Sequence, residues 1–174
     1  MSTAVPTTPT AVTPSPASPR QLVAWAFYDW ASSPFFAVII TFVFATYVTT
    51  AVAADEIQGT ALWSRMTVIG ALIIAFTSPI LGAIADVGGR RKPWLATFTL
   101  ASSAATALLW LVAPDEDYLL LALVLVLVAN VTNEIGQAFY NAMLPDLARE
   151  DQIGRWSGWG WGLGYIAGIV ALSL

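Results

Sequence analysis

Five long apolar runs, separated by short polar breaks, organise most of this chain. They cover residues 22–53, 62–85, 93–113, 118–142 and 156–174. A helix needs about 20 apolar residues to cross the hydrocarbon core of a bilayer, and each run approaches or exceeds that length. The connections between the runs are short, so neighbouring helices are expected to be antiparallel. The pattern predicts an all-α fold, a polytopic membrane helix bundle.

Residues 1–20 have a different character, because they are rich in Pro, Thr, Ser and Ala and carry one charged side chain, Arg20. Such a segment cannot bury a core, and we expect a disordered tail followed by a transmembrane domain over 21–174. The first apolar run is not expected to be a cleaved signal peptide. It is far longer than a signal's apolar region of about 7–15 residues, and it contains Asp29.

Composition supports a membrane protein, with 57% hydrophobic and only 10% charged residues, against about 25% charged in soluble domains. The chain has no cysteine and no histidine, which excludes disulfides, thiol catalysis and metal sites built on these side chains. No basic run exceeds three residues, which disfavours a nucleic-acid partner. We expect the protein to bind no cofactor and not to be an enzyme, since no set of base, nucleophile and oxyanion site can be named.

The charged side chains divide between the two ends of the predicted spans. Six cations fall on the side of the tail: Arg20, Arg90, Arg91, Lys92, Arg149 and Arg155. The other side holds five acids and at most one cation, Arg65. Cytoplasmic loops of membrane proteins carry the excess of Lys and Arg, so the N-terminus and the 86–92 loop are expected in the cytoplasm, with membrane lipids around the spans.

Two acids, Asp29 and Glu134, lie inside predicted spans, where ionisable groups are costly and usually mark a pathway. Glu134 belongs to a polar stripe with helical spacing, formed by Asn130, Asn133, Glu134, Gln137 and Asn141. A weaker stripe on the first span comprises Trp25, Asp29, Ser32 and Phe36. We interpret the stripes as cavity lining; the alternative is hydrogen bonding between helices. Either acid is a candidate to carry a coupling proton or to be structural.

The last run is rich in glycine, and Gly160, Gly164 and Gly168 recur at every fourth position. Small residues with this spacing let another helix approach closely, so this face is predicted to pack against a neighbouring helix. No strand precedes it and no Lys-Ser/Thr follows, which argues against a phosphate-binding loop.

The loop at residues 82–92 resembles the motif between the second and third helices of the major facilitator superfamily. Gly82, Asp86, Gly89, Arg91 and Lys92 fit that motif, whereas Val87 stands where a cation is usual. A narrower resemblance, to the vacuole-effluxer-like branch, rests on WAFYDWA at 25–31, SPILGAIAD at 78–86, GRRKPW at 89–94, FYNAMLP at 139–145 and SGWG at 157–160.

The resemblance implies a secondary transporter with two six-helix halves and a solute path between them. In that fold the first and fourth helices line the central cavity. The motif's acid, here Asp86, is thought to latch the cytoplasmic side against the second half, with Arg90 or Arg91 in the same charge network. Similarity to eukaryotic members suggests amino acids as the small solute.

A sixth helix and a second half are not among these residues, so we expect the chain to be the N-terminal part of a longer transporter in the cell membrane. Helices missing from the chain would then be its partners. The alternative function is a membrane scaffold or interaction protein that associates through the glycine-rich face.

Overall fold

The computed structural model describes residues 17–174, which form long helices and, within that range, no strand. The prediction of an all-α helix bundle is confirmed. Residues 1–16, most of the predicted tail, lie outside the described residues.

The first crossing is a continuous helical segment that changes its winding. It comprises α1 (Pro19–Phe35), the π-helix η1 (Phe36–Phe42), the short α2 (Phe44–Tyr47) and a second π-helix η2 (Val48–Val52). It begins two residues inside the predicted tail, because Pro19 occupies the first helical position and the Gln21 side chain accepts a hydrogen bond of 2.8 Å from the Ser18 backbone N–H. The wide turns follow Pro34, whose ring prevents a regular α-helical hydrogen bond.

The second helix, α3 (Glu56–Gly88), is about 50 Å long at 1.5 Å per residue. Asp55 caps its start by accepting a hydrogen bond of 2.8 Å from the Gln58 backbone N–H. Gly89 ends it in a left-handed conformation, with φ of 58°. The chain therefore reverses at once into α4 (Arg91–Leu108), which a 3-10 turn, η3 (Leu109–Leu111), extends.

A short turn, η4 (Glu116–Tyr118), leads into α5 (Leu119–Ala142). The one-turn helix α6 (Leu144–Leu147) and the turn η5 (Glu150–Gln152) then connect to the last helix, α7 (Ile153–Leu172).

Within residues 17–174, four helical segments are long and apolar enough to cross a membrane: Pro19–Val52, Glu56–Gly88, Arg91–Leu111 and Glu116–Leu147. The predicted fifth span, α7, has the length at 20 residues but is not among the segments that meet this condition. Its glycines and tryptophans contribute little hydropathy, and it is packed against α1 along much of its length. Lateral packing against α1 is therefore what places α7 in the bundle.

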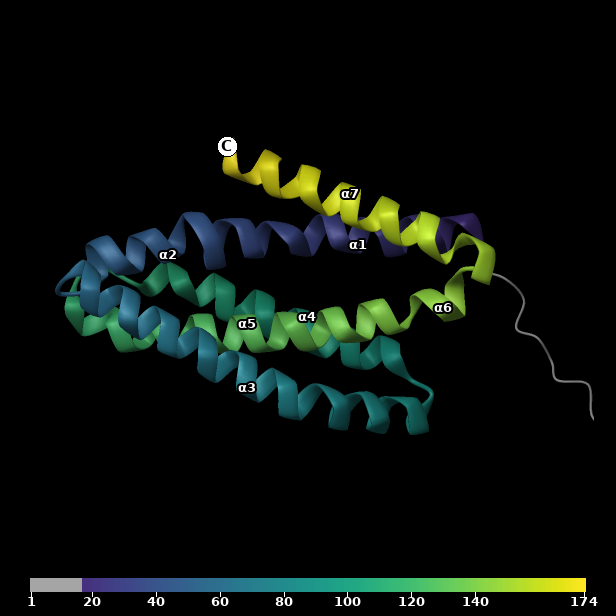
Figure 1. The fold of residues 1–174 in the computed structure, drawn as a ribbon, viewed down its shortest axis with the longest axis horizontal. Coiled ribbons are helices and arrows are strands. Elements are labelled where there is room, and N and C mark those ends of the chain that lie inside the picture. Colours follow the sequence, from purple (N-terminus) through teal and green to yellow (C-terminus); the bar gives the residue numbers. More distant parts are fainter. Residues whose placement is uncertain (1–16) are drawn as a thin grey trace, which may run out of the picture.

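The helices form layers, in the order α7, α1, then the pair α4 and α5, and α3 outermost (Figure 1). One end of the bundle, here called the hairpin end, holds the α3–α4 connection, α6 and the start of α1 (Figure 1). Its core centres on Trp25 and Tyr140, whose rings stack with centroids 4.3 Å apart. At the opposite end the core is built on Val48 and Val52, which pack against Leu119.

Candidate functional site

A groove of about 640 Å³ lies where α1 and η1, α5 and α7 meet. Its polar lining residues are Asp29, Ser33, Glu134, Gln137 and Asn141, and its aromatic ones are Phe36, Phe42, Trp161 and Tyr165. The remaining lining residues are Ala37, Gly164, Gly168, Ile169 and Leu172. The groove thus combines acids and amides with an apolar and aromatic wall, all from helices of the bundle.

Asp29 is the most deeply placed polar group of the groove, with 7% of its surface exposed. Gln137 donates from Nε2 to Asp29 Oδ1 over 3.2 Å, which joins α1 to α5. The other amide atom, Gln137 Oε1, is buried and has no hydrogen-bond partner within the described residues. One acceptor at the centre of the groove is therefore unsatisfied, and such groups cost about 1–3 kcal/mol.

The polar stripe predicted on α5 divides into two parts. Glu134, Gln137 and Asn141 line the groove, together with Asp29 from the first crossing. Asn130 lies one turn further from the hairpin end, where its Nδ2 atom is 3.6 Å from the position that a Cβ on Gly70 would take. It therefore faces α3. Asn133 is half-buried outside the groove, and its Oδ1 has no hydrogen-bond partner in the described part of the chain.

Of the stripe predicted on the first crossing, Asp29 and Phe36 line the groove, whereas Trp25 and Ser32 do not. Ser33 lines the groove, whereas the Ser32 hydroxyl turns back to the Asp29 carbonyl of its own helix at 3.5 Å. Trp25 is buried and donates from Nε1 to the Tyr140 carbonyl over 3.0 Å, so it joins helices and does not line the groove. The sequence interpretation missed Ser33.

Two aromatic residues of α7, Trp161 and Tyr165, were also missed. Their rings lie 6.1 Å apart with an interplanar angle of 56°. The signal was present in the sequence, since each follows a glycine of the predicted packing face by one residue.

That glycine face forms the side of the groove where α7 meets the first crossing. A Cβ on Gly160 would come within 3.1 Å of the Trp25 ring, and one on Gly168 would lie 3.6 Å from the Ala37 Cβ. At Gly164 a Cβ would overlap the Ser33 hydroxyl and lie 2.7 Å from Asp29 Oδ2. The three glycines therefore let α7 approach the acid-bearing face of α1.

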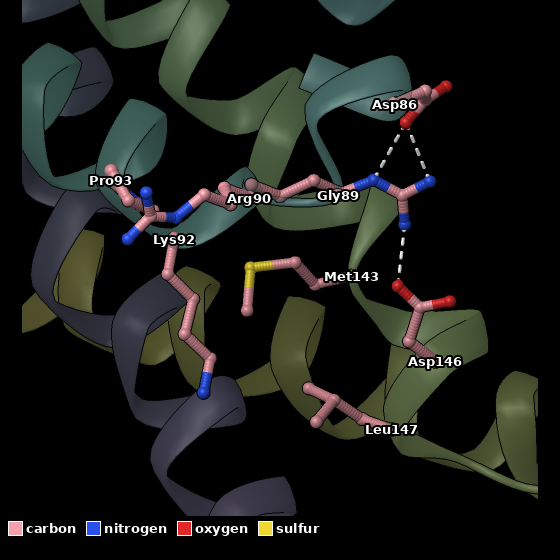
Figure 2. Close-up of a pocket in the computed structure, with 9 residues that line it drawn as sticks. Asp86, Gly89, Arg90, Lys92, Pro93, Met143, Asp146 and Leu147 are labelled. Atoms are coloured by element: carbon pink, nitrogen blue, oxygen red, sulfur yellow. Dashed lines mark hydrogen bonds and ion pairs between the residues drawn. The ribbon is translucent and has the colours of Figure 1, made fainter. Parts of the chain in front are cut away.

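A second site lies at the hairpin end, where one guanidinium holds two acids (Figure 2). Arg91 donates from Nε to Asp86 Oδ1 over 2.9 Å, and its Nη2 forms an ion pair with the same oxygen at 2.8 Å. Its Nη1 donates to Asp146 Oδ2 and to the Ala142 carbonyl, both at 2.6 Å. We call Asp86, Arg91 and Asp146 the charge clamp. It ties the end of α3 and the start of α4 to α6, and the bond to the Ala142 carbonyl adds the end of α5.

The local chain geometry explains the clamp. Gly89 reverses the chain in two residues, so Asp86 in the last turn of α3 meets Arg91 at the first position of α4. Gly82, in the second-last turn of α3, would have open space around an added Cβ. Of the two arginines expected in the same charge network as Asp86, Arg91 pairs with the acid. The side chains of Arg90 and Lys92 point away from the acids (Figure 2).

Sequence reasoning missed Asp146, the third member of the clamp. The available signal was an acid directly after Pro145, at the end of the fourth apolar run and on the same predicted side as the cationic loop. A cavity of about 510 Å³ lies between the hairpin and α6, and the clamp residues line it. Among residues 17–174, no three acidic side chains gather in a way that could hold a metal ion.

Comparison with known proteins places these features in context. A sequence model of the family described as "Vacuole effluxer Atg22 like" matches residues 51–174. A Bacillus subtilis (strain 168) protein named "Uncharacterized MFS-type transporter YxiO" is 35% identical over 154 residues. The match covers 87% of this chain but 36% of the relative, so the chain spans little more than a third of that curated relative's length. No solved structure matches the chain.

Proposed function

The chain belongs to the vacuole effluxer Atg22-like family, and on that premise we propose that it is the N-terminal part of a secondary transporter for a small solute. The resemblance inferred from the 82–92 loop and its companion segments is confirmed at the level of the family. With its long apolar helices, the chain is a multi-pass integral membrane protein. We place it in the cell membrane.

The groove is the observation that carries this proposal. Its acids and amides lie on α1 and α5, two helices that are long and apolar enough to span a membrane. Polar side chains at such depth need water, a ligand or one another, because lipid tails satisfy no hydrogen bonds. In our proposal the groove forms one wall of the solute path, and helices beyond this chain form the facing wall.

The charge clamp is proposed as part of the gate at the hairpin end. Its side chains are partly exposed, with 27% for Arg91, 58% for Asp86 and 67% for Asp146. Exposed ion pairs are worth about 0.2–1 kcal/mol each, so the clamp can break and re-form as the path opens and closes. The excess of cations at this end supports a cytoplasmic location.

We further propose that transport proceeds by alternating access and that the solutes are amino acids. Both parts of the proposal are based on membership of the family. Asp29 and Glu134 are the proposed carriers of a coupling proton, because they are the two acids of the groove. A structural role for Asp29 is the competing interpretation, since Gln137 already binds it.

Transport by the complete gene product tests the proposal. Proteoliposomes are loaded with a mixture of isotopically labelled amino acids and other small metabolites, and efflux is followed by mass spectrometry. We expect at least one solute to leave faster than from protein-free liposomes, and the double variant Asp29→Asn/Glu134→Gln to lose this efflux. Efflux of every solute at the protein-free rate would count against a transporter.

The scaffold alternative has less support. The glycine face that was expected to bind another protein is covered by the first crossing of the same chain, at Gly160, Gly164 and Gly168. The glycines of α7 that have open space around them are Gly154, Gly158 and Gly162, which recur at every fourth position and share a different face. A scaffold role would therefore need this second face, not the one formed by Gly160, Gly164 and Gly168.

A further inference from the structure

Three buried polar atoms follow one another from the groove toward the hairpin end. Gln137 Oε1 belongs to the groove, the Tyr140 hydroxyl lies one turn further along α5, and Trp156 Nε1 lies near the start of α7. None of the three has a hydrogen-bond partner within the described residues. A buried polar group without a partner destabilises the folded protein, so each of these atoms calls for a small partner of its own.

Tyr140 is held in place by everything except its hydroxyl group. Its ring stacks on the rings of Trp25 and Tyr28, with centroids 4.3 and 4.9 Å apart, and its backbone carbonyl accepts the Trp25 Nε1–H. Only 3% of the residue is exposed. Trp156 packs against the same cluster, and we call Trp25, Tyr140 and Trp156 the aromatic seam. Packing therefore uses the ring of Tyr140 but not its hydroxyl.

The glycine face of α7 brings that hydroxyl near Asp29. The Tyr140 oxygen lies 3.1 Å from the position of a Cβ on Gly160, and Asp29 Oδ2 lies 2.7 Å from that of a Cβ on Gly164. Residues four apart on a helix have Cβ atoms about 5–6 Å from each other. The hydrogen bond from Gln137 goes to the other carboxylate oxygen, Oδ1. A short chain of water molecules, at about 3 Å per hydrogen bond, can therefore join the hydroxyl to Oδ2.

Water suits these atoms better than a further helix does. The chain itself already covers all three atoms, so a helix packed against its outer surface would not contact them. Buried water is the usual partner of such groups, and one molecule makes about three hydrogen bonds. The Tyr140 hydroxyl can accept and donate, whereas Trp156 Nε1 can only donate. A water molecule held by Trp156 therefore keeps both of its hydrogens for other acceptors.

We propose that ordered water occupies the aromatic seam and carries protons between Asp29 and the hairpin end. A protonated Asp29 gives its proton to the first water molecule and becomes a carboxylate. Each further water molecule, and the Tyr140 hydroxyl, accepts one proton and releases another. The proton leaves into the solvent at the start of α7, where Arg155 is exposed, and Trp156 keeps its own proton throughout. This inference rests on the proposed coupling role of Asp29 and adds the route of its proton.

The other titratable groups around Asp29 lie outside this route. Glu134 of α5 and Tyr165 of α7 line the groove, on the side away from the seam, and neither Lys nor Arg is among the lining residues. Tyr28, on the same helix as Asp29, shares its hydroxyl with Thr99 over 2.7 Å. Thr99 also donates to the Leu95 carbonyl, so it keeps a partner when the Tyr28 hydroxyl is removed. Tyr28→Phe is therefore a matched control for Tyr140→Phe.

The first experiment looks for the water, in the complete gene product in detergent micelles. X-ray pulses split water into hydroxyl radicals, and a radical formed from a bound water molecule oxidises the side chain that holds it. Phe139 is the buried control, because it is 4% exposed and packs against Trp94 and Phe98. We expect mass spectrometry to find Tyr140 oxidised at least about tenfold faster than Phe139, since a buried water touches only one of the two rings. Equally slow oxidation of both would overturn the inference.

The second experiment follows the proton, in proteoliposomes that contain a pH-sensitive dye. The solute mixture of the efflux experiment is added outside, and proton flux is compared with the exchange of labelled for unlabelled solute at equal concentrations, which needs no net proton release. We expect Tyr140→Phe to slow the proton flux about tenfold, the effect of one hydrogen bond in the transition state, and to leave exchange unchanged. Tyr28→Phe should leave both rates unchanged.

Each result of the second experiment decides about the route. Unchanged proton flux in Tyr140→Phe, or solute efflux without proton flux in the unaltered protein, would overturn it. Loss of exchange together with proton flux would make Tyr140 a structural residue and overturn it as well. If Tyr140→Phe does not fold, Trp156→Phe, which removes the Nε1–H, takes its place. Footprinting needs no transport and efflux needs no particular proton route, so this inference and the proposed function can fail separately.

Discussion

Gly164 determines how closely α7 can approach α1. A side chain at this position would meet the Ser33 hydroxyl and the buried Asp29 carboxylate, and both residues line the groove. Two residues earlier, Gly162 has no neighbouring atom within 4 Å of an added Cβ. The same substitution at the two glycines should therefore have opposite effects.

We expect Gly164→Ala to lower the stability of the protein by about 1–3 kcal/mol, the usual cost of overpacking. Gly162→Ala should be neutral or stabilising by up to about 1 kcal/mol, because alanine favours the helix. Thermal unfolding followed by circular dichroism in detergent measures both. Equal unfolding temperatures for the two variants would contradict the close packing of α7 on α1.

At the scale of helices, the charge clamp joins three helix ends through one guanidinium. Asp86 is five residues from Arg91, and the turn at Gly89 brings them together. Asp146 is 55 residues from Arg91 and reaches it because α5 and α4 pack side by side. Loss of either acid should loosen the hairpin end without disturbing the rest of the bundle.

Asp86→Asn and Asp146→Asn are each expected to expose the groove from the hairpin end. The chain has no cysteine, so Asn141→Cys introduces a single reporter at the groove. Loss of an exposed ion pair worth about 1 kcal/mol should raise the rate at which maleimide labels this cysteine about fivefold. Glu150→Gln is the control. Unchanged labelling in both clamp variants would remove the clamp from the gate.

Sequence patterns predicted the helices better than the contacts between them. The apolar runs and the glycine after α3 depend on local chemistry, which is why the hairpin could be placed in advance. The clamp acid Asp146 and the groove residue Ser33 depend on how distant helices pack. Helical spacing placed Asn130 on the same stripe as Glu134. In the structure Asn130 faces Gly70 of α3, so it does not line the groove as Glu134 does.

Over the whole molecule, large apolar side chains face outward along α3 and at the ends of other helices. Phe76 is 73% exposed and Trp110 is 93% exposed. Such a surface is stable only against lipid or further helices, in agreement with a membrane location. The charged loops then decide which end faces the cytoplasm.

Single cysteines at the two ends test the orientation. Val87→Cys lies at the hairpin end, where the side chain is 93% exposed, and Asp117→Cys lies at the opposite end. With the hairpin end in the cytoplasm, a membrane-impermeant maleimide on intact cells should label Asp117→Cys alone. Labelling of Val87→Cys should require permeabilised cells, and the reverse pattern would refute the proposed orientation.

The wide turns of the first crossing have a consequence for tolerated chain length. A π-helical turn closes its hydrogen bond over five residues instead of four, so η1 holds more residues than an α-helix of equal span. Deleting Ile40 lets the π-helical turn close as an α-helical turn. The helical segments before and after η1 then keep the same faces toward the bundle. Deleting Ile73 within the regular α3 rotates everything beyond it by about 100°.

We therefore expect the protein without Ile40 to stay folded and monodisperse in detergent, and the protein without Ile73 to aggregate, as size-exclusion chromatography would report. Equal behaviour of the two deletions would argue against spare length in η1. The π-helical segments of the first crossing, η1 and η2, are thus places where a residue can be gained or lost without redirecting a helix, and η1 lies beside the acids of the groove.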